Sequence, residues 1–343
     1  MAGPTHHEDL VDPFGRVIKD LRISVTDRCN FRCTYCMPEE GMKWLPRSEV
    51  LTFEEIERLA RVFVEYYGVE GIRLTGGEPT VRAHLPVLVS KLAAIGGPDG
   101  PIDVAMTTNG ATLARNAGRY RDAGLNRINV SLDSLDRSRF EQMTRRDELD
   151  RVLAGIRAAR DAGFSPVKVN SVVERDVNDD EIVDLAAFGR AEGVEVRFIE
   201  FMPLDASDEW QRARVVGQDE IVARLGEVWD LEQVPARGAA PADRWRYLDD
   251  GFRDGGGTVG VIPTVTKPFC GDCDRVRLTA EGQFRTCLFA TDEFDLRAPM
   301  RAGADDDQLE AVIRGAVGTK WAGHNISQVD FVRPDRSMSQ IGG

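Results

Sequence analysis

The sequence has no uncharged apolar run near the roughly 18 residues that a membrane helix requires, and its start lacks the basic-then-apolar order of a signal peptide. It also has no long run of lysine or arginine, and 57 acidic against 44 basic residues give a charge of −13, which argues against a broad nucleic-acid-binding face. Six cysteines in 343 residues are too few for a disulfide-stapled secreted fold. We therefore expect a cytoplasmic protein with no nucleic acid and no membrane among its partners.

What remains is the composition of a folded protein, with 42% apolar and 29% charged residues. Its length suggests about two domains. Residues 1–16 are polar and contain proline, so we expect an N-terminal tail, followed by a main domain at 17–235 and a smaller C-terminal α+β domain at 236–343.

From residue 17 to about residue 202, short β-branched runs alternate with amphipathic helical stretches. The predicted strands are 22–26, 71–75, 103–107, 127–132, 166–173 and 194–201. Each interval leaves room for one crossover helix, which indicates a parallel sheet. Because six units rather than eight are present, we predict an incomplete (β/α)6 TIM-like barrel, with a doubly wound sheet as the alternative.

Several local signals refine this prediction. Thr52 and Glu55 form a capping box before a helix, and residues 178–181 should open another helix in the same way. Residues 236–257 are rich in Ala, Pro, Asp and Gly, so we interpret them as a long connection. Residues 275–288 are typical of a β-hairpin that turns at 280–282.

The first cysteine group follows the first predicted strand, where barrel enzymes carry their chemistry. Cys29, Cys33 and Cys36 have the spacing CxxxCxxC, so three thiolates can converge in one loop. They suit a 4Fe-4S cluster with one open iron, whereas structural zinc wants a fourth protein ligand that is not found nearby. Zinc and unliganded thiols remain the alternatives at this point.

A second motif, residues 75–79 (TGGEP), follows the next strand directly. Its glycines would let the backbone approach a ligand, although a simple tight turn explains them too. Polar residues also follow the other strands, at 107–110, 131–133, 168, 170 and 200–202, and would face the same mouth. The cysteine spacing with this motif resembles the radical S-adenosylmethionine (radical SAM) superfamily. That resemblance implies that the open iron binds SAM and that its cleavage yields a 5′-deoxyadenosyl radical.

The second cysteine group consists of Cys270, Cys273 and Cys287, which the predicted hairpin brings together. A zinc knuckle and a second 4Fe-4S cluster with an open iron are both compatible with this spacing. Period-two alternation places Arg275 and Arg277 on one face. With the three other cations that strands carry, Arg22, Arg73 and Lys168, they suggest a polyphosphate ligand, since guanidinium groups match phosphate oxygens.

Segments 21–38, 73–79, 106–110, 270–278, 285–288 and 338–343 together resemble the GTP 3′,8-cyclase family, also called molybdenum cofactor biosynthesis protein A. The resemblance implies two 4Fe-4S clusters, with the first held by Cys29, Cys33 and Cys36 and the second by Cys270, Cys273 and Cys287. It implies SAM contacts by Tyr35, Gly77, Glu78, Ser131 and Met202. It implies GTP contacts by Arg22, Arg73, Thr107, Lys168, Arg275, Val276 and Arg277, and a Gly342-Gly343 tail that enters the cavity.

The family resemblance further implies a homodimer, an external electron donor and a downstream cyclic pyranopterin monophosphate synthase. Three features depart from the family: an extra turn at 96–100, Asp274 in place of the usual Asn, and a divergent stretch at 236–266. Two other functions remain open at this level. One is a different radical SAM enzyme with an auxiliary cluster, such as a peptide modifier, and the other is a zinc or iron-sulfur scaffold without catalysis.

Overall fold

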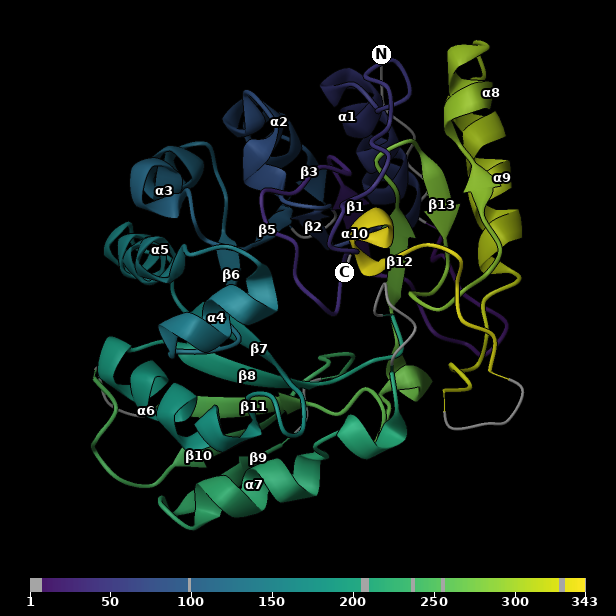
Figure 1. The fold of residues 1–343 in the computed structure, drawn as a ribbon. Helices are drawn as coiled ribbons and strands as arrows, with labels where there is room; N and C mark the ends of the chain where they lie inside the picture. Colours follow the sequence, from purple (N-terminus) through teal and green to yellow (C-terminus); the bar gives the residue numbers. More distant parts are fainter. Residues whose placement is uncertain are drawn as a thin grey trace.

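The computed structural model describes residues 8–97, 100–204, 210–235, 238–253, 257–326 and 331–342. Its centre is a curved sheet of twelve strands in the order β14-β13-β12-β1-β2-β5-β6-β7-β8-β11-β10-β9. Figure 1 shows most of the helices around the outside of this curve, with the short α10 and the C-terminus lying within it. Among the helices of the described ranges, none has the length and hydropathy to span a bilayer.

Six parallel strands form the middle of the sheet, and they are the six that the sequence predicts. They are β1 (Asp20–Ser24), β2 (Gly71–Thr75), β5 (Asp103–Thr108), β6 (Arg127–Ser131), β7 (Val167–Val173) and β8 (Glu195–Glu200). The crossovers contain α1 (Phe53–Arg61), α2 (Leu85–Ala93), α3 (Leu113–Asp122), α4 (Arg137–Thr144), α5 (Leu149–Asp161) and α6 (Ile182–Glu192). The incomplete (β/α)6 barrel is confirmed.

The C-terminal part of the chain extends the same sheet at both edges. β12 (Arg275–Leu278) lies parallel to β1, and β11 (Thr258–Ile262) lies parallel to β8. Antiparallel strands then continue each edge: β13 (Gln283–Arg285) and β14 (Phe294–Asp295) on one side, β10 (Asp243–Tyr247) and β9 (Leu231–Val234) on the other. The remaining elements are β3 (Gly96–Gly97), β4 (Gly100–Pro101), α7 (Gln218–Gly226), α8 (Arg297–Arg301), α9 (Asp306–Val317) and α10 (Met338–Ile341).

Local sequence signals explain where elements begin. Thr52 Oγ1 accepts a hydrogen bond from Glu55 N at 3.1 Å, and the Glu55 carboxylate accepts one from Thr52 N at 2.7 Å, so the predicted capping box is confirmed. The predicted hairpin is confirmed as well, because β12 and β13 pair antiparallel around a turn with Gly282 at φ +86°.

Three local predictions need correction. A helical turn does begin after Asn178 and leads into α6, but it has no side-chain cap, because the buried Asn178 amide instead donates to Asp133 O and Val172 O. The stretch 236–257 is not simply a connection, since β10 lies within it and buries Trp245 and Tyr247. The predicted tail is packed from residue 8 onward, with Leu10 only 1% exposed; residues 1–7 lie outside the described residues. So do Pro98 and Asp99 of the extra turn, residues 236, 237 and 254–256 of the divergent stretch, and Gly343.

Candidate active site

A cavity of about 500 Å³ lies along the strand residues that carry the predicted polar groups. It collects almost all of the residues that the sequence singled out, from both halves of the chain. These are Arg22, Cys29, Cys33, Tyr35, Cys36, Arg73, Gly77, Glu78, Thr107, Ser131, Lys168, Met202, Arg275 and Arg277. Val276 does not line it, because strand alternation turns its side chain away from the cavity and into the hydrophobic core. Cys270, Cys273 and Cys287 are not among its lining residues either.

The first cysteine group forms one wall of this cavity, and its three thiols are free. A tight turn, in which Cys36 N donates to Cys33 O at 2.9 Å, keeps the loop compact. Burial raises the pKa of the Cys29 thiol to about 11 and that of Cys36 to about 12, and neighbouring acidic groups add to both shifts. Three adjacent thiolates at this site therefore need a positively charged partner.

The donor set of the first cysteine group fits a 4Fe-4S cluster, because three free cysteines in one loop can each bind one iron and leave the fourth iron open. Among the described residues, no three His, Cys, Asp or Glu side chains are grouped closely enough to hold a single metal ion.

The glycines of the TGGEP motif are required by packing of two loops. A Cβ atom on Gly76 would lie 2.4 Å from Thr26 O, and one on Gly77 would lie 2.4 Å from Arg28 O. Gly77 N and Glu78 N donate to these same two carbonyl oxygens at 2.8 Å. The two glycines therefore let this loop pack against the backbone of residues 26–28, which leads into the first cysteine group.

Glu78 ties this loop to the end of β5. Its buried carboxylate accepts hydrogen bonds from Thr108 Oγ1 at 2.6 Å and from Asn109 N at 2.7 Å, besides two from Thr80. Asn109 in turn donates to Asn30 Oδ1, within the first cysteine loop, at 2.8 Å. Because its oxygens are already occupied, the side chain of Glu78 orders the loops around the cysteines.

Tyr35 is held by a buried carboxylate that the sequence reasoning did not single out as a site residue. Its hydroxyl donates to Asp133 Oδ2 at 2.7 Å, while Asp133 Oδ1 accepts from Val172 N at 2.8 Å. Burial raises the pKa of Asp133 to about 6, against the lowering effect of these two hydrogen bonds. The pair fixes the side chain of Tyr35, which is close enough to Cys33 and Cys36 for their charges to act on it.

Strand register brings together the basic side chains that line the cavity. Arg22 of β1 lies beside Arg277 on one neighbour and Arg73 on the other. Lys168 occupies the row that also contains Asn129 and, two strands away, Thr107. Residues in one row of a parallel sheet point to the same face, so these positive charges converge although they are distant in sequence.

Two of these cations have an unsatisfied nitrogen. Arg22 Nε and Arg73 Nε are buried without a hydrogen-bond acceptor, although Arg22 Nε lies 3.6 Å from the carboxylate of Asp20. Burial and neighbouring cations lower the pKa of Arg73 to about 9 and that of Lys168 to about 8. Buried donors and mutually repelling cations are stabilised by an anion, so the cavity fits a polyphosphate.

The second cysteine group borders the same cavity. The neighbours of its cysteines line the cavity, namely Phe269, Asp274 and Leu288. Two buried cations stabilise this region: Lys320 Nζ donates to Arg275 O at 2.7 Å and Thr286 O at 2.6 Å, and Arg16 donates to the carbonyls of Cys270 and Ala322.

The described end of the chain enters the cavity region. Met338 and Ser339 of α10 line the cavity, and Gly342 O accepts a hydrogen bond from Arg277 Nη1. Gly342 has φ +71°, and a Cβ there would lie 2.5 Å from Ser24 Oγ and 2.6 Å from Thr75 Oγ1. Only glycine fits this position in the observed conformation.

Sequence reasoning missed further charged residues of the site. Asp20, Arg127 and Arg197 also line the cavity. Strand register pairs Asp20 with Arg275, and the charges of Arg127 and Arg197 both act on Lys168. Alternation along those strands could have indicated them. No sequence signal marked Arg16, which lies in the predicted tail.

Family models match nearly the whole chain. The Radical SAM superfamily matches residues 23–189, and Molybdenum Cofactor Synthesis C matches residues 194–326. "GTP 3′,8-cyclase 2" of Mycobacterium bovis is 49% identical over 335 residues, covering 97% of this chain and 92% of the relative. "GTP 3′,8-cyclase" of Mycobacterium sp. (strain KMS) is 50% identical over 346 aligned positions, covering 100% and 96%. The protein of that name from Corynebacterium glutamicum is 47% identical over 97% and 89%.

Solved structures share the fold at low sequence identity. Streptococcus suis SuiB bound to S-adenosylmethionine matches with a TM-score of 0.56 at 13% identity, covering 87% of this chain and 68% of that chain. The structure titled anSMEcpe with bound AdoMet matches with a TM-score of 0.50 at 15% identity, covering 62% and 58%. At this identity the likeness shows the architecture alone.

Proposed function

Since this chain belongs to the radical SAM superfamily and, within it, to the GTP 3′,8-cyclase family of molybdenum cofactor biosynthesis, we propose that it converts GTP to (8S)-3′,8-cyclo-7,8-dihydroguanosine 5′-triphosphate. One observation carries the proposal: a single cavity is lined both by the first cysteine group and by a set of cations, of which Arg22 and Arg73 have buried Nε atoms without a hydrogen-bond acceptor. A radical source and a polyphosphate site would thereby share one cavity.

Cys29, Cys33 and Cys36 would hold the first 4Fe-4S cluster. When bound there, the cluster and SAM supply an electron and a 5′-deoxyadenosyl radical, which takes the hydrogen atom from ribose C3′. Tyr35, Gly77, Ser131 and Met202 would position SAM, since all four line the cavity. Glu78 would act indirectly, by holding the loops that surround the cysteines.

Arg22, Arg73 and Lys168 would bind the triphosphate of GTP, with Thr107 as a hydrogen-bonding neighbour. Arg275 and Arg277 would orient the nucleotide from β12, the strand beside Arg22, and Val276 could contribute only its backbone. Once C3′ has lost hydrogen, it bonds to guanine C8, and one electron and one proton complete the dihydro product. The product is therefore an isomer of GTP. Enclosure by the sheet keeps water away from the radical.

Cys270, Cys273 and Cys287 would hold a second 4Fe-4S cluster, which would bind the guanine of GTP through its open iron. The buried cations Arg16 and Lys320 support this assignment, because positive charge beside the cysteines offsets the charge of their thiolates. A zinc site is the alternative, and elemental analysis of anaerobically purified protein distinguishes the two. The second cluster predicts about eight irons per chain and no zinc.

The assembly and cellular context follow from the family. The protein would act as a homodimer in the cytoplasm, receive electrons from an external donor, and pass its product to cyclic pyranopterin monophosphate synthase. The division into a barrel at 17–235 and an auxiliary domain at 236–343 stays a prediction. Strands of the second part complete the sheet of the barrel.

Two variants of the reconstituted protein test the proposal. Cys33→Ala should abolish 5′-deoxyadenosine formation while about four irons per chain remain. Arg275→Ala should retain both clusters and SAM binding but use GTP at least about tenfold less well, because a charge-assisted contact is worth roughly 1.5 to 3 kcal/mol. Continued SAM cleavage by Cys33→Ala would refute the radical site, and unchanged GTP turnover by Arg275→Ala would refute its role at the substrate.

A further inference from the structure

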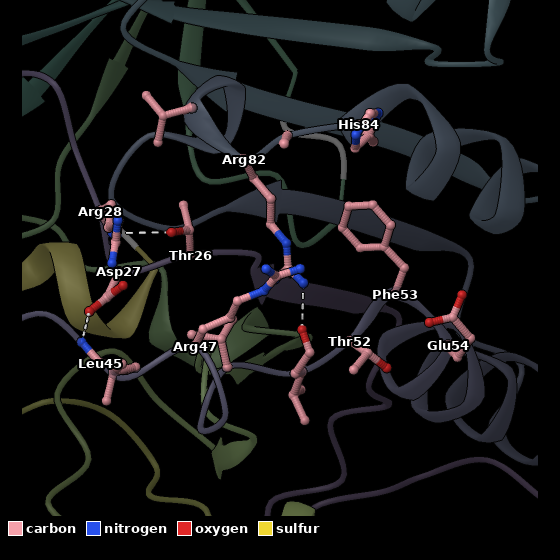
Figure 2. A pocket seen from close by; sticks show the side chains of 14 residues that line it. Thr26, Asp27, Arg28, Leu45, Arg47, Thr52, Phe53, Glu54, Arg82 and His84 are labelled. Atoms are coloured by element: carbon pink, nitrogen blue, oxygen red, sulfur yellow. Dashed lines mark hydrogen bonds between the residues drawn. The ribbon is translucent and has the colours of Figure 1, made fainter.

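A second hollow, of about 640 Å³, lies beside the segment that leads into the first cysteine group. Residues 26–28 form one side of it, residues 81–84 another, and parts of residues 45–54 complete the lining. Figure 2 shows that basic side chains dominate its labelled polar groups: Arg28, Arg47, Arg82 and His84 all border it. This hollow is separate from the substrate cavity, and no residue of it belongs to the proposed catalytic machinery.

The hollow is built around a fixed guanidinium. Arg82 donates to Leu51 O at 2.6 Å and to Val25 O, and it stacks on the ring of Phe53 at 4.6 Å. Figure 2 shows the guanidinium of Arg47 directed toward that of Arg82. Burial and the charge of Arg47 both lower the pKa of Arg82, and the opposing effect of Glu54 and Glu55 is smaller, so these carboxylates compensate the pair only in part.

The acidic residues of the hollow are already engaged. Asp27 accepts a hydrogen bond from Leu45 N, and Glu54 lies 3.7 Å from Lys91 Nζ. The basic side chains therefore remain available to an external anion.

The positive charge continues around the first cysteine loop. Arg32 donates to Cys29 O at 2.8 Å, and Arg146 donates to Asn30 O at 3.0 Å. Within the described part of the chain, no ion pair is formed by any of five arginines, which we call the basic face: Arg28, Arg32, Arg47, Arg82 and Arg146. Most exposed arginines elsewhere, such as Arg137 and Arg175, are paired with carboxylates. The concentration of unpaired arginines at this loop therefore calls for an external partner.

We propose that the basic face is the docking surface for the external electron donor, and that this donor is a redox protein with an acidic surface. The inference rests on the proposed function, which requires one electron to pass from the donor to the first cluster; the donor is oxidised by one electron, and no proton or group moves with it. The face covers the loop that holds Cys29, Cys33 and Cys36, so a protein bound there is close to its electron acceptor. The net charge of −13 repels an acidic donor from the rest of the surface and steers it to this face.

The test compares variants that change the basic face with one that changes charge elsewhere. Arg28 and Arg47 are exposed, and neither side chain makes a hydrogen bond or ion pair in the described structure, so Arg47→Glu and the double variant Arg28→Gln/Arg47→Gln leave internal contacts intact. Arg246→Glu is the matched control, because Arg246 lies on β10 toward the other edge of the sheet and makes only an exposed ion pair at 3.4 Å with Glu232. The probe is a strongly acidic ferredoxin, used with the reconstituted enzyme.

Two quantities are measured at low and at high salt: the Kd for ferredoxin and the rate of 5′-deoxyadenosine formation with reduced ferredoxin or with dithionite. We expect both basic-face variants to raise the Kd at least about tenfold at low salt and to flatten its salt dependence, while dithionite-driven turnover and iron content stay unchanged. Arg246→Glu should behave like the wild type.

An unchanged Kd in both basic-face variants, or an equal increase in Arg246→Glu, would overturn the docking proposal. If Arg47→Glu lost iron, the double glutamine variant, which removes charge without adding a carboxylate, decides the question. Failure of the proposed function has a different signature, since wild-type protein would then cleave SAM with dithionite but leave GTP unchanged.

Discussion

The fit of the C-terminal tail can be tested at a single atom, by the substitution Gly342→Ala. The added Cβ would lie 2.5 Å from Ser24 Oγ and 2.6 Å from Thr75 Oγ1, well inside ordinary contact distance, at a φ of +71°. The left-handed conformation alone costs a non-glycine residue roughly 1 to 2 kcal/mol. Displacing the tail also breaks the hydrogen bond from Arg277, which as a charge-assisted contact is worth about 1.5 to 3 kcal/mol.

Together these free-energy penalties shift the equilibrium from the bound tail toward the displaced tail by a factor of about 50 or more. We expect cyclisation of GTP by Gly342→Ala to fall at least about tenfold, while iron content, SAM cleavage and thermal unfolding stay close to wild type, because chain ends contribute little to global stability. The assay is mass analysis of the nucleotide products formed with GTP, SAM and dithionite.

Gly163→Ala is the matched control. Gly163 has a similar φ of +83°, but a Cβ there would meet nothing within 4 Å. It therefore carries the same backbone strain without the overlap, and it should keep full cyclase activity at a modest loss of stability. Full cyclisation by Gly342→Ala, or an equal loss in Gly163→Ala, would refute the reasoning.

Three further predictions concern charge in the fold and the site. Burial and Arg197 lower the pKa of Lys168 to about 8, so this side chain loses its positive charge as pH rises through 8. The KM for GTP should therefore increase about tenfold between pH 7 and 9. In Lys168→Arg, which keeps its charge, the increase in KM should be much smaller. Because the folded pKa is below the usual 10.5, the same group also makes the protein gain stability between pH 8 and 10.5, a slope that urea unfolding at several pH values should show and that Lys168→Arg should lack. Lys320→Met leaves the carbonyls of Arg275 and Thr286 without their donor, so iron should fall toward four per chain with SAM cleavage retained; eight irons would contradict this. The fully buried Glu200 accepts from Gln218 N, Val265 N and Thr266 N at 2.7 to 2.9 Å, so Glu200→Gln should lower the free energy of unfolding by about 2 kcal/mol or more, whereas the exposed control Glu227→Gln should not.

The sequence predicted the parts of this molecule that depend on local pattern. The six parallel strands are short runs whose apolar residues are buried, so composition and spacing were enough to place them. Both cysteine groups and the TGGEP loop are likewise local motifs. β10 was missed because its buried residues, Trp245 and Tyr247, lie in a stretch whose Pro, Gly and Asp content is typical of loops.

The parts that could not be predicted depend on register and on distant contacts. The pairing of β12, β1 and β2 places Arg277, Arg22 and Arg73 in one row of the sheet. Its β12–β1 part joins strands about 250 residues apart in the sequence. Asp133 was visible as a strand end, but only the fold shows that it holds the Tyr35 hydroxyl. Arg16 lies in the segment that the sequence predicts to be a tail, yet it donates hydrogen bonds to backbone carbonyls of Cys270 and Ala322. Every residue has a backbone carbonyl, so the sequence could not identify these partners.

The most direct test of the central claim uses GTP carrying deuterium at ribose C3′, incubated anaerobically with the reconstituted protein, SAM and dithionite. The account predicts that deuterium appears in 5′-deoxyadenosine and that a nucleotide isomeric with unlabelled GTP forms at the same time. Formation of 5′-deoxyadenosine without deuterium, with GTP recovered unchanged, would contradict it.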